Sequence, residues 1–376
     1  MKKALLILFG IAILSSCIYK NPLIGTWIEQ DNFINPAIYE IGQDYYKILN
    51  GPFPGQRIYK VKKDTFMFDN FFELEKIRFE TNEDELRFYS VDNDSLLSKF
   101  ERNVYRNFID YFNVKKNTAI MLPVLESKQI SWDDNINTIV FNNEDTCSVF
   151  FNGENSKLDS LTYLKFYPSV DYSEYVVENN LVFCDYRLKL YELDKLKIEL
   201  QKAHKNRIIY VTQDSLNNLM GLSVFLPYIE SNIPDSLKSK HPLPPPPPPP
   251  PTINFEDFNS ENILCKIDLN KTVLNDNEVS PEKLDSITRE KIQSVKGFIV
   301  HVYFDEKMDF ESYLKKLSAL RENYYSVRNE YSLNKFNEPN YEDLDSEKLR
   351  EVQNLFPMRI REINKTEYEK IRKYAL

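Results

Sequence analysis

The chain has 376 residues, of which 42% are hydrophobic and 14% aromatic, so it has enough apolar material for packed cores and does not have the composition of a disordered chain. At about 150 residues per domain this length allows two or three domains. The net charge is −9 and no long run of Lys or Arg follows the first residues, which excludes the electrostatic footprint of a nucleic-acid-binding protein. Proteins or small ligands are therefore the expected partners.

The first residues have the order of a secretory signal. Lys2 and Lys3 come first, an apolar stretch over residues 4–13 follows, and Leu14-Ser15-Ser16-Cys17 ends the segment. The apolar stretch is shorter than the roughly 20 residues that a spanning helix needs. The alternatives are an ordinary secretory signal with a chance cysteine, or a short membrane span.

The same segment resembles the lipobox of bacterial lipoproteins. The resemblance implies that residues 1–16 are a signal peptide and that Cys17 becomes the first mature residue, with a diacylglyceryl group on its thiol. We therefore expect a cell-envelope protein that is attached to a membrane by its lipid and faces the periplasm. Whether the inner or the outer membrane carries it is left open.

The N-terminal third, from Pro22 to about Asn103, is expected to consist of short alternating strands with no helix between them. Seven or eight strands at this spacing predict an antiparallel barrel or sandwich. The expected strands are Gly25 to Glu29, Ala37 to Leu49, Arg57 to Val61, Thr65 to Phe68, Lys76 to Glu80, Glu85 to Tyr89 and Leu97 to Arg102.

The start Leu23-Ile24-Gly25-Thr26-Trp27 resembles the G-x-W start of lipocalin-like domains, and Ser98-Lys99-Phe100-Glu101-Arg102 is similar to their closing strand. The resemblance implies a lipocalin-like β-barrel over residues 17–112, in which Trp27 closes the floor and Arg102 packs across it. A carrier of a small apolar ligand is one function that this implies. A generic small barrel whose interior is filled by Phe and Tyr is the other interpretation.

Residues 105–112 are interpreted as a short aromatic connector, and residues 113–240 as an α+β module. Within this module a helix is predicted from Leu190 to His204, because its leucines fall on one face. A second helix is predicted from Ser215 to Ile229. The expected strands are Asn137 to Phe141, Ser148 to Phe151, Leu181 to Tyr186 and Arg207 to Val211.

Residues 241–252 are interpreted as a linker. It contains eight consecutive prolines, from Pro244 to Pro251. Proline fixes φ and lacks an N–H, so such a run adopts the polyproline II conformation and forms a stiff spacer of about 25 Å.

Residues 253–376 have the most regular pattern of the chain. Residues 262–275 predict a hairpin, Phe298 to Phe304 a buried strand and Pro357 to Ile360 an edge strand. Helix starts are predicted at Ser280-Pro281-Glu282, at Asp309 and at Asp345 or Ser346. The helix after Asp309 carries an apolar stripe at a spacing of three or four residues, made of Phe310, Leu314, Leu317, Leu320, Tyr324, Val327 and Tyr331.

The run from Pro244 to Ile363 resembles the periplasmic part of ExbD/TolR-type biopolymer transport proteins, in the form common among Bacteroidetes. The middle third looks like a weaker second copy, so one or two such modules are expected. The matching pieces are the prolines, Asn259 to Leu264, Lys296 to Val300, Tyr313 to Arg328, Lys335 to Leu344 and Phe356 to Ile363.

In that family a small α+β sandwich follows a single transmembrane helix, whose proton-accepting Asp lies inside a pentameric channel that energises a TonB- or TolA-like partner. The only apolar stretch of this chain, from Ala4 to Ser16, holds no Asp and ends in the lipobox. The resemblance therefore implies the periplasmic binding fold and not the proton coupling.

Residues with the spacing of a catalytic or metal site are scarce. His204, His241 and His301 lack metal-ligand spacing, and neither a phosphate-binding glycine loop nor a G-x-S-x-G motif occurs. We expect no catalytic residues, no metal and no cofactor apart from the covalent lipid. Beside the lipidated cysteine, Cys147, Cys184 and Cys265 form an odd set; one pair could bridge, and buried free thiols are favoured.

These observations predict a non-enzymatic envelope lipoprotein that serves as a periplasmic binding or scaffold component, associated with ExbB/ExbD/TonB-type machinery. The family resemblance also implies a homodimer. A carrier function of the barrel is the alternative, and the sequence does not identify the ligand or the partner. The candidate partner-binding residues are Phe310, Leu314, Leu317, Tyr324 and Tyr331 on the long helix, and Met358 on the edge strand.

Overall fold

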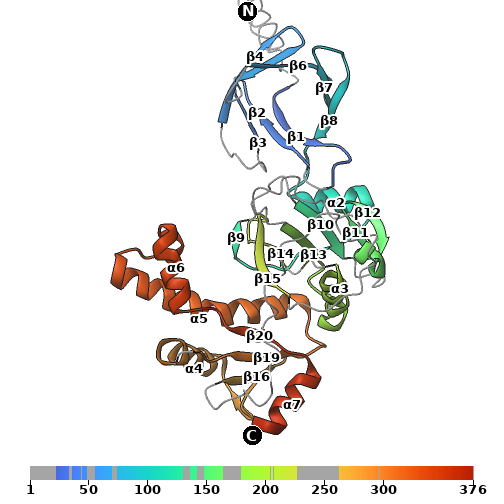
Figure 1. Cartoon of the computed structure of the whole chain (residues 1–376). Helices are drawn as coiled ribbons and strands as arrows, with labels where there is room; N and C mark the ends of the chain where they lie inside the picture. Colours follow the sequence, from blue (N-terminus) through green and yellow to red (C-terminus); the bar gives the residue numbers. More distant parts are fainter. Residues whose placement is uncertain are drawn as a thin grey trace, which may run out of the picture. The chain divides into compact units, whose positions relative to one another are not determined.

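The computed structural model describes residues 23–33, 36–43, 45–48, 56–69, 74–129, 136–141, 148–163, 179–203, 205, 207–226, 262–295 and 297–375. Cys17, at which lipidation is expected, Cys147, His204, His241 and the proline run lie outside these residues. The chain divides into two compact units, one holding the chain up to Lys116 and the other most of the chain from Asn117 onward. Each unit is described by itself (Figure 1).

The first unit contains a closed barrel of eight strands, each hydrogen-bonded antiparallel to the next, as the strand pattern predicts. The expected strand from Ala37 to Leu49 is two strands, because the Gly42 N–H donates to the Tyr45 carbonyl across a turn at 2.8 Å. The strands are β1 (Gly25–Glu29), β2 (Ile38–Ile41), β3 (Tyr45–Ile48), β4 (Gln56–Lys62), β5 (Thr65–Asp69), β6 (Leu74–Thr81), β7 (Glu85–Ser90) and β8 (Leu96–Arg102).

The segment after the barrel is a helix, α2 (Phe108–Lys116), where the sequence predicted only a connector. Aromatic residues have modest helix propensity, so tertiary contacts decide its conformation. The buried Tyr111 hydroxyl accepts a hydrogen bond from the Asp31 N–H at 2.9 Å and donates to the Glu29 carbonyl at 3.2 Å. These bonds fix the helix to the end of β1.

The middle module, residues 117–226, is built on a seven-stranded sheet with the order β12-β11-β10-β13-β14-β15-β9. Strands β13 and β14 are parallel, and helix α3 connects them. The elements are β9 (Lys128–Gln129), β10 (Ile136–Phe141), β11 (Ser148–Phe151), β12 (Glu154–Lys157), η1 (Leu158–Tyr163), β13 (Asn179–Cys184), α3 (Leu190–Lys202), β14 (Arg207–Gln213) and β15 (Leu219–Phe225).

The second helix predicted in this module, from Ser215 to Ile229, is wrong. The segment forms β15, which pairs antiparallel with β14 over all seven residues of both strands. A turn makes this hairpin, because the Asp214 carboxylate accepts the backbone N–H groups of Leu216 and Asn218, each at 2.8 Å. Burial then alternates along the strand, with Leu222 buried and Phe225 exposed.

The C-terminal module, residues 262–375, has a five-stranded mixed sheet with the order β18-β17-β16-β19-β20. An edge strand was predicted at Pro357 to Ile360; the edge strand of the sheet is β20, which covers Ile360–Glu362 and so begins at the last residue of that segment. The elements are β16 (Ile263–Ile267), β17 (Thr272–Leu274), β18 (Asn277–Val279), α4 (Pro281–Ser294), β19 (Val300–Phe304), α5 (Phe310–Phe336), η3 (Tyr341–Asp343), α6 (Ser346–Leu355), β20 (Ile360–Glu362) and α7 (Lys365–Ala375).

The starts of α4, α5 and α6 are those that the sequence predicts. The side chains of Ser280, Asp309 and Asp345 each precede a helix and accept a hydrogen bond from a backbone N–H three residues later. For Asp309 the donor is Ser312, at 2.8 Å. Helix α7 was not predicted; its Tyr368 ring lies 5.5 Å from that of Tyr303.

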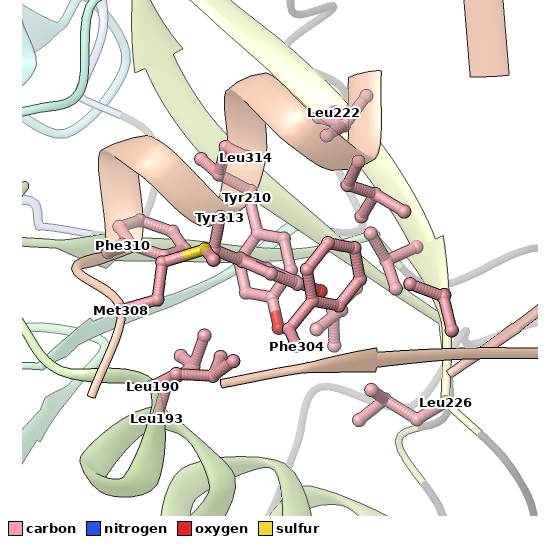
Figure 2. Packing of buried hydrophobic residues seen from close by; sticks show 14 of the residues in the cluster. Leu190, Leu193, Tyr210, Leu222, Leu226, Phe304, Met308, Phe310, Tyr313 and Leu314 are labelled. Atoms are coloured by element: carbon pink, nitrogen blue, oxygen red, sulfur yellow. The ribbon is translucent and has the colours of Figure 1, made fainter. Parts of the chain in front are cut away.

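The two modules of the second unit share one continuous apolar core. Helix α5 contributes residues to it along most of its length, and both sheets contribute strand residues. Figure 2 shows this core at the start of α5, where the ring of Phe304 from the C-terminal sheet lies 5.0 Å from that of Tyr313, and where Leu222 of the middle sheet belongs to the same cluster. Among the described helices none is both long and apolar enough to cross a membrane.

We predict that Leu314→Ala lowers the free energy of unfolding of the second unit by about 2–5 kcal/mol, because it leaves a cavity in a fully buried site. The matched control is Leu333→Ala on the same helix, where the side chain is 50% exposed and the expected change is within about 0.5 kcal/mol. Urea denaturation measures both. Equal effects of the two variants would contradict the position of α5 in the core.

Candidate functional site

The apolar stripe of α5 is not a free docking surface. Phe310, Leu314, Leu317 and Tyr324 are at most 1% exposed, so the expectation that they bind a separate partner chain is wrong for this fold. The physical reason is that the middle module already covers the start of the helix, where the Phe310 ring packs edge-on against Tyr210 at 5.2 Å.

The two remaining candidate partner-binding residues are half-buried and lie in different local contacts. The Tyr331 ring packs on Phe356 at 5.3 Å, and its hydroxyl donates to the Glu351 carboxylate at 3.1 Å. Met358 precedes β20 and packs against the shared core. Met358 therefore marks the edge of the sheet, while Tyr331 belongs to the contact between α5 and α6.

Two loops meet where the modules join. These junction loops, residues 185–189 and 305–309, each lead from a buried strand into a helix. Lys189 and Asp309 form an antiparallel bridge. The Leu190 N–H donates to the Met308 carbonyl at 2.9 Å, and the Phe310 N–H donates to the Leu188 carbonyl at 2.8 Å.

Two further backbone hydrogen bonds extend this pairing. The Tyr191 N–H donates to the Glu306 carbonyl at 3.0 Å, and the Glu311 N–H donates to the Tyr186 carbonyl at 3.2 Å. All four donors lie in the first turn of a helix, where backbone N–H groups have no partner within the helix. Each module thus supplies acceptors for the helix start of the other.

A polar cluster made of Lys197, Tyr313 and Glu362 lies within the same junction. The Lys197 ammonium is 3.1 Å from the Glu362 Oε2 and 3.4 Å from the Tyr313 hydroxyl oxygen. The Tyr313 hydroxyl donates to the Glu362 Oε1 at 2.8 Å. Lys197 comes from α3, Tyr313 from α5 and Glu362 from β20, so the cluster joins the two modules by side chains.

Electrostatics fix the protonation of this cluster. Burial alone lowers the pKa of the Lys197 ammonium, but the Glu362 carboxylate and the neighbouring phenols more than offset it, and the pKa lies well above its usual value. Burial and the same carboxylate raise the pKa of Tyr313. Lys197 is therefore a cation and Tyr313 a neutral donor at physiological pH, which suits a structural contact better than proton transfer.

Tyr210 lies beside this cluster but takes no part in its hydrogen bonds. Its ring centroid is 6.3 Å from that of Tyr313, and its buried hydroxyl has no hydrogen-bond partner in the part of the chain that is described. Burial raises the pKa of Tyr210, so the phenol stays neutral. Its contribution is consequently one of ring packing.

The residues singled out in the barrel lie together. The Trp27 ring is fully buried, its Nε1 donates to the Leu23 carbonyl at 2.8 Å, and the Arg102 guanidinium lies 3.8 Å from the ring centroid. Arg102 also donates to the carbonyl of Ile24 at 2.8 Å. This contact ties the first strand of the barrel to its last.

Aromatic side chains pack against one another inside the barrel. Tyr59 stacks on Phe66 at 4.4 Å, and Phe88 packs edge-on against Phe100 at 5.2 Å. These residues belong to one buried cluster with Trp27. The described part of the interior is thus occupied by the protein's own rings.

The remaining described side chains with possible catalytic or metal-binding chemistry are two cysteines and one histidine, each buried on a different strand. Cys184 and Cys265 are free thiols, and burial raises the pKa of both. His301 lies on β19, where burial and then Arg361 lower its pKa to about 4, so it is neutral at physiological pH. Within the described residues no cluster of three or more His, Cys, Asp or Glu side chains is arranged to hold a metal ion.

No protein family, curated protein or solved structure matches this chain. The junction must therefore be judged on its own geometry. Sequence reasoning missed Lys197, Glu362 and the pairing of the junction loops. The available signal was the similarity of Val182-Phe183-Cys184-Asp185 to Val302-Tyr303-Phe304-Asp305, each followed by an apolar residue three positions later.

We predict that Tyr313→Phe destabilises the second unit by about 1.5–3 kcal/mol, because it removes a hydrogen bond to a charged carboxylate. Tyr210→Phe is the matched control: it removes a buried hydroxyl without a partner and is expected to be nearly neutral or stabilising. Urea unfolding of both variants tests the cluster. A larger loss for Tyr210→Phe than for Tyr313→Phe would contradict it.

Proposed function

We propose that this protein is a non-enzymatic cell-envelope lipoprotein that acts as a periplasmic binding or scaffold component. The observation that carries the proposal is the single apolar core shared by the middle and C-terminal modules, because it makes these modules one compact body suited to holding other chains. The proposed anchor is the lipidated Cys17, and the proposed orientation is toward the periplasm.

The ExbD/TolR-like character of the two modules is part of this proposal. It is supported by the sequence stretches that resemble the family and by the architecture of the C-terminal module, in which helices pack on a small mixed sheet. A lipocalin-like origin of the barrel is supported by the stacking of Arg102 on Trp27. Neither resemblance brings a proton-coupling residue with it.

A scaffold role is favoured over a carrier role by the barrel interior. The contacts of Tyr59 with Phe66 and of Phe88 with Phe100 occupy the volume that an apolar ligand would need. A carrier would require these rings to move, at the cost of their packing. The proposed binding function therefore lies on the outside of the molecule.

The proposed partner is an ExbB/ExbD/TonB-type protein, and the proposed contact is the sheet edge formed by β20. An edge strand presents backbone groups that a second chain can pair with. Met358 lies just before this strand and is only partly buried. It replaces the buried stripe of α5 as the position at which contact is expected.

We predict that a photo-crosslinking amino acid at Met358 captures an ExbB/ExbD/TonB-type protein in intact cells, identified by mass spectrometry of the adduct. The control position is Ile58 on β4 of the barrel, which is 71% exposed and belongs to the other compact unit. No such adduct from position 358, or equal adducts from both positions, would refute the proposed contact.

We predict further that Cys17→Ala moves the protein from the membrane fraction to the soluble fraction, because the diacylglyceryl group can no longer be attached. The matched variant Cys147→Ala removes a thiol outside the lipobox and should leave the protein with the membrane. Ultracentrifugation and immunoblotting of both variants give the answer. Membrane retention of Cys17→Ala at the level of the unaltered protein would exclude the lipid anchor.

A further inference from the structure

We propose that the middle and C-terminal modules are two copies of one folding unit with a self-complementary pairing surface, and that the chain occupies this surface with its own second copy. The partner of the junction is thus the other module of the same chain, in place of a second molecule. The inference concerns the assembly of the two modules and does not depend on the proposed envelope function.

The first argument is the reciprocity of the junction loops. Lys189 and Asp309, which are 309 − 189 = 120 positions apart, bridge directly to each other. The bond from Leu190 to Met308 has its counterpart in the bond from Phe310 to Leu188, with both partners shifted by the same 120 positions. Exchange of the two modules therefore maps one hydrogen bond onto the other.

The outer pair of hydrogen bonds obeys the same relation. Tyr191 donates to Glu306 and Glu311 donates to Tyr186, and 311 − 191 and 306 − 186 are both 120. When two identical units are related by a two-fold axis, every contact between them occurs twice, once in each direction. The paired hydrogen bonds of the junction have this property. The local axis passes between Lys189 and Asp309.

The second argument is that the two loops have the same internal structure. The Asp185 Oδ1 accepts the Arg187 N–H at 2.9 Å, and the Asp305 Oδ1 accepts the Lys307 N–H at 3.0 Å. The carbonyls of the same two aspartates accept the N–H groups of Leu188 at 3.1 Å and Met308 at 2.9 Å. Equivalent residues thus close equivalent turns.

The third argument is the topology of the sheets. The order β12-β11-β10-β13-β14 of the middle module corresponds strand by strand to β18-β17-β16-β19-β20 of the C-terminal module. Strands β13 and β14 are parallel, and so are β19 and β20. Helix α3 follows β13 and precedes β14 in the chain, and helix α5 follows β19 and precedes β20. Strands β15 and β9 are additions to the middle copy.

The polar cluster shows why the copies pair within one chain. The counterpart of Lys197 in the C-terminal module is Leu317, since 197 + 120 = 317. Two C-terminal modules paired by the same surface would place Leu317 where Lys197 lies, and the Glu362 carboxylate would lose its ammonium partner. The Glu362 side chain is only 30% exposed, and a carboxylate that has lost much of its water is costly without a partner, so the cluster favours the pairing of unlike copies over a homodimer.

The test uses the full chain with Lys189→Cys and Asp309→Cys. Directly opposed residues of an antiparallel pair that exchange no hydrogen bonds have Cα atoms about 4.5 Å apart, within the range for a disulfide. After mild oxidation we expect a product with the mass of one chain, and peptide mapping should find the link between positions 189 and 309. The control pair Lys195→Cys and Asp309→Cys, with Lys195 on an exposed position of α3, should not link.

Each result decides the inference. A disulfide-linked product with the mass of two chains would mean that the surface pairs copies from different molecules, which overturns closure within one chain. The absence of any link between positions 189 and 309, or equal linkage in the control pair, would overturn the pairing itself. Peptide mapping keeps the other cysteines out of the result, because it identifies the linked positions.

The selective role of the cluster is tested in the same double-cysteine chain. Lys197→Glu places two carboxylates together and should lower the fraction of the intrachain link several-fold, whereas Lys195→Glu should leave it unchanged. If circular dichroism shows that Lys197→Glu does not fold, Lys197→Leu serves in its place and should give a smaller loss. A linked fraction that neither Lys197 variant alters would show that the cluster does not select the pairing.

Discussion

The burial of the α5 stripe is the constraint on which the second unit depends. The helix has 27 residues and is about 40 Å long, whereas β19 has five residues and is about 17 Å long. The sheet of its own module is too short to cover such a helix. The start of α5 is therefore covered by the middle module, through Tyr210, while α4 also packs on the helix and its end is covered by η3, α6 and Phe356.

The ion pair in this junction is better explained by specificity than by stability. The side chains of Lys197 and Glu362 are only 12% and 30% exposed, and the partial loss of water is repaid by their attraction only with good geometry and further hydrogen bonds. Tyr313 supplies such a bond to the carboxylate. Apolar packing around the cluster provides most of the adhesion, while the charged groups determine which surfaces meet.

Local signals in the sequence were sufficient for much of the fold and for little of the junction. The barrel strands follow from alternation, and the starts of α4, α5 and α6 follow from Ser280, Asp309 and Asp345, because a cap is a local interaction. Strand β15 was wrongly predicted as a helix, because its conformation depends on pairing with β14. Lys197 and Glu362 are 165 positions apart, and no periodicity brings such residues together.

Joining two copies in one chain changes which residues can face each other across the symmetry axis. In a true homodimer the residue on the axis faces its own copy, so a charged residue there meets the same charge, and like charges directly opposed across a strand pair are destabilising. Here the axis passes between Lys189 and Asp309, which carry opposite charges. That combination is available only when the two copies differ in sequence. The opposite charges of Lys189 and Asp309, and the presence of Lys197 in only one of the two modules, thus lead to the same conclusion: the junction has diverged to pair the middle module with the C-terminal one.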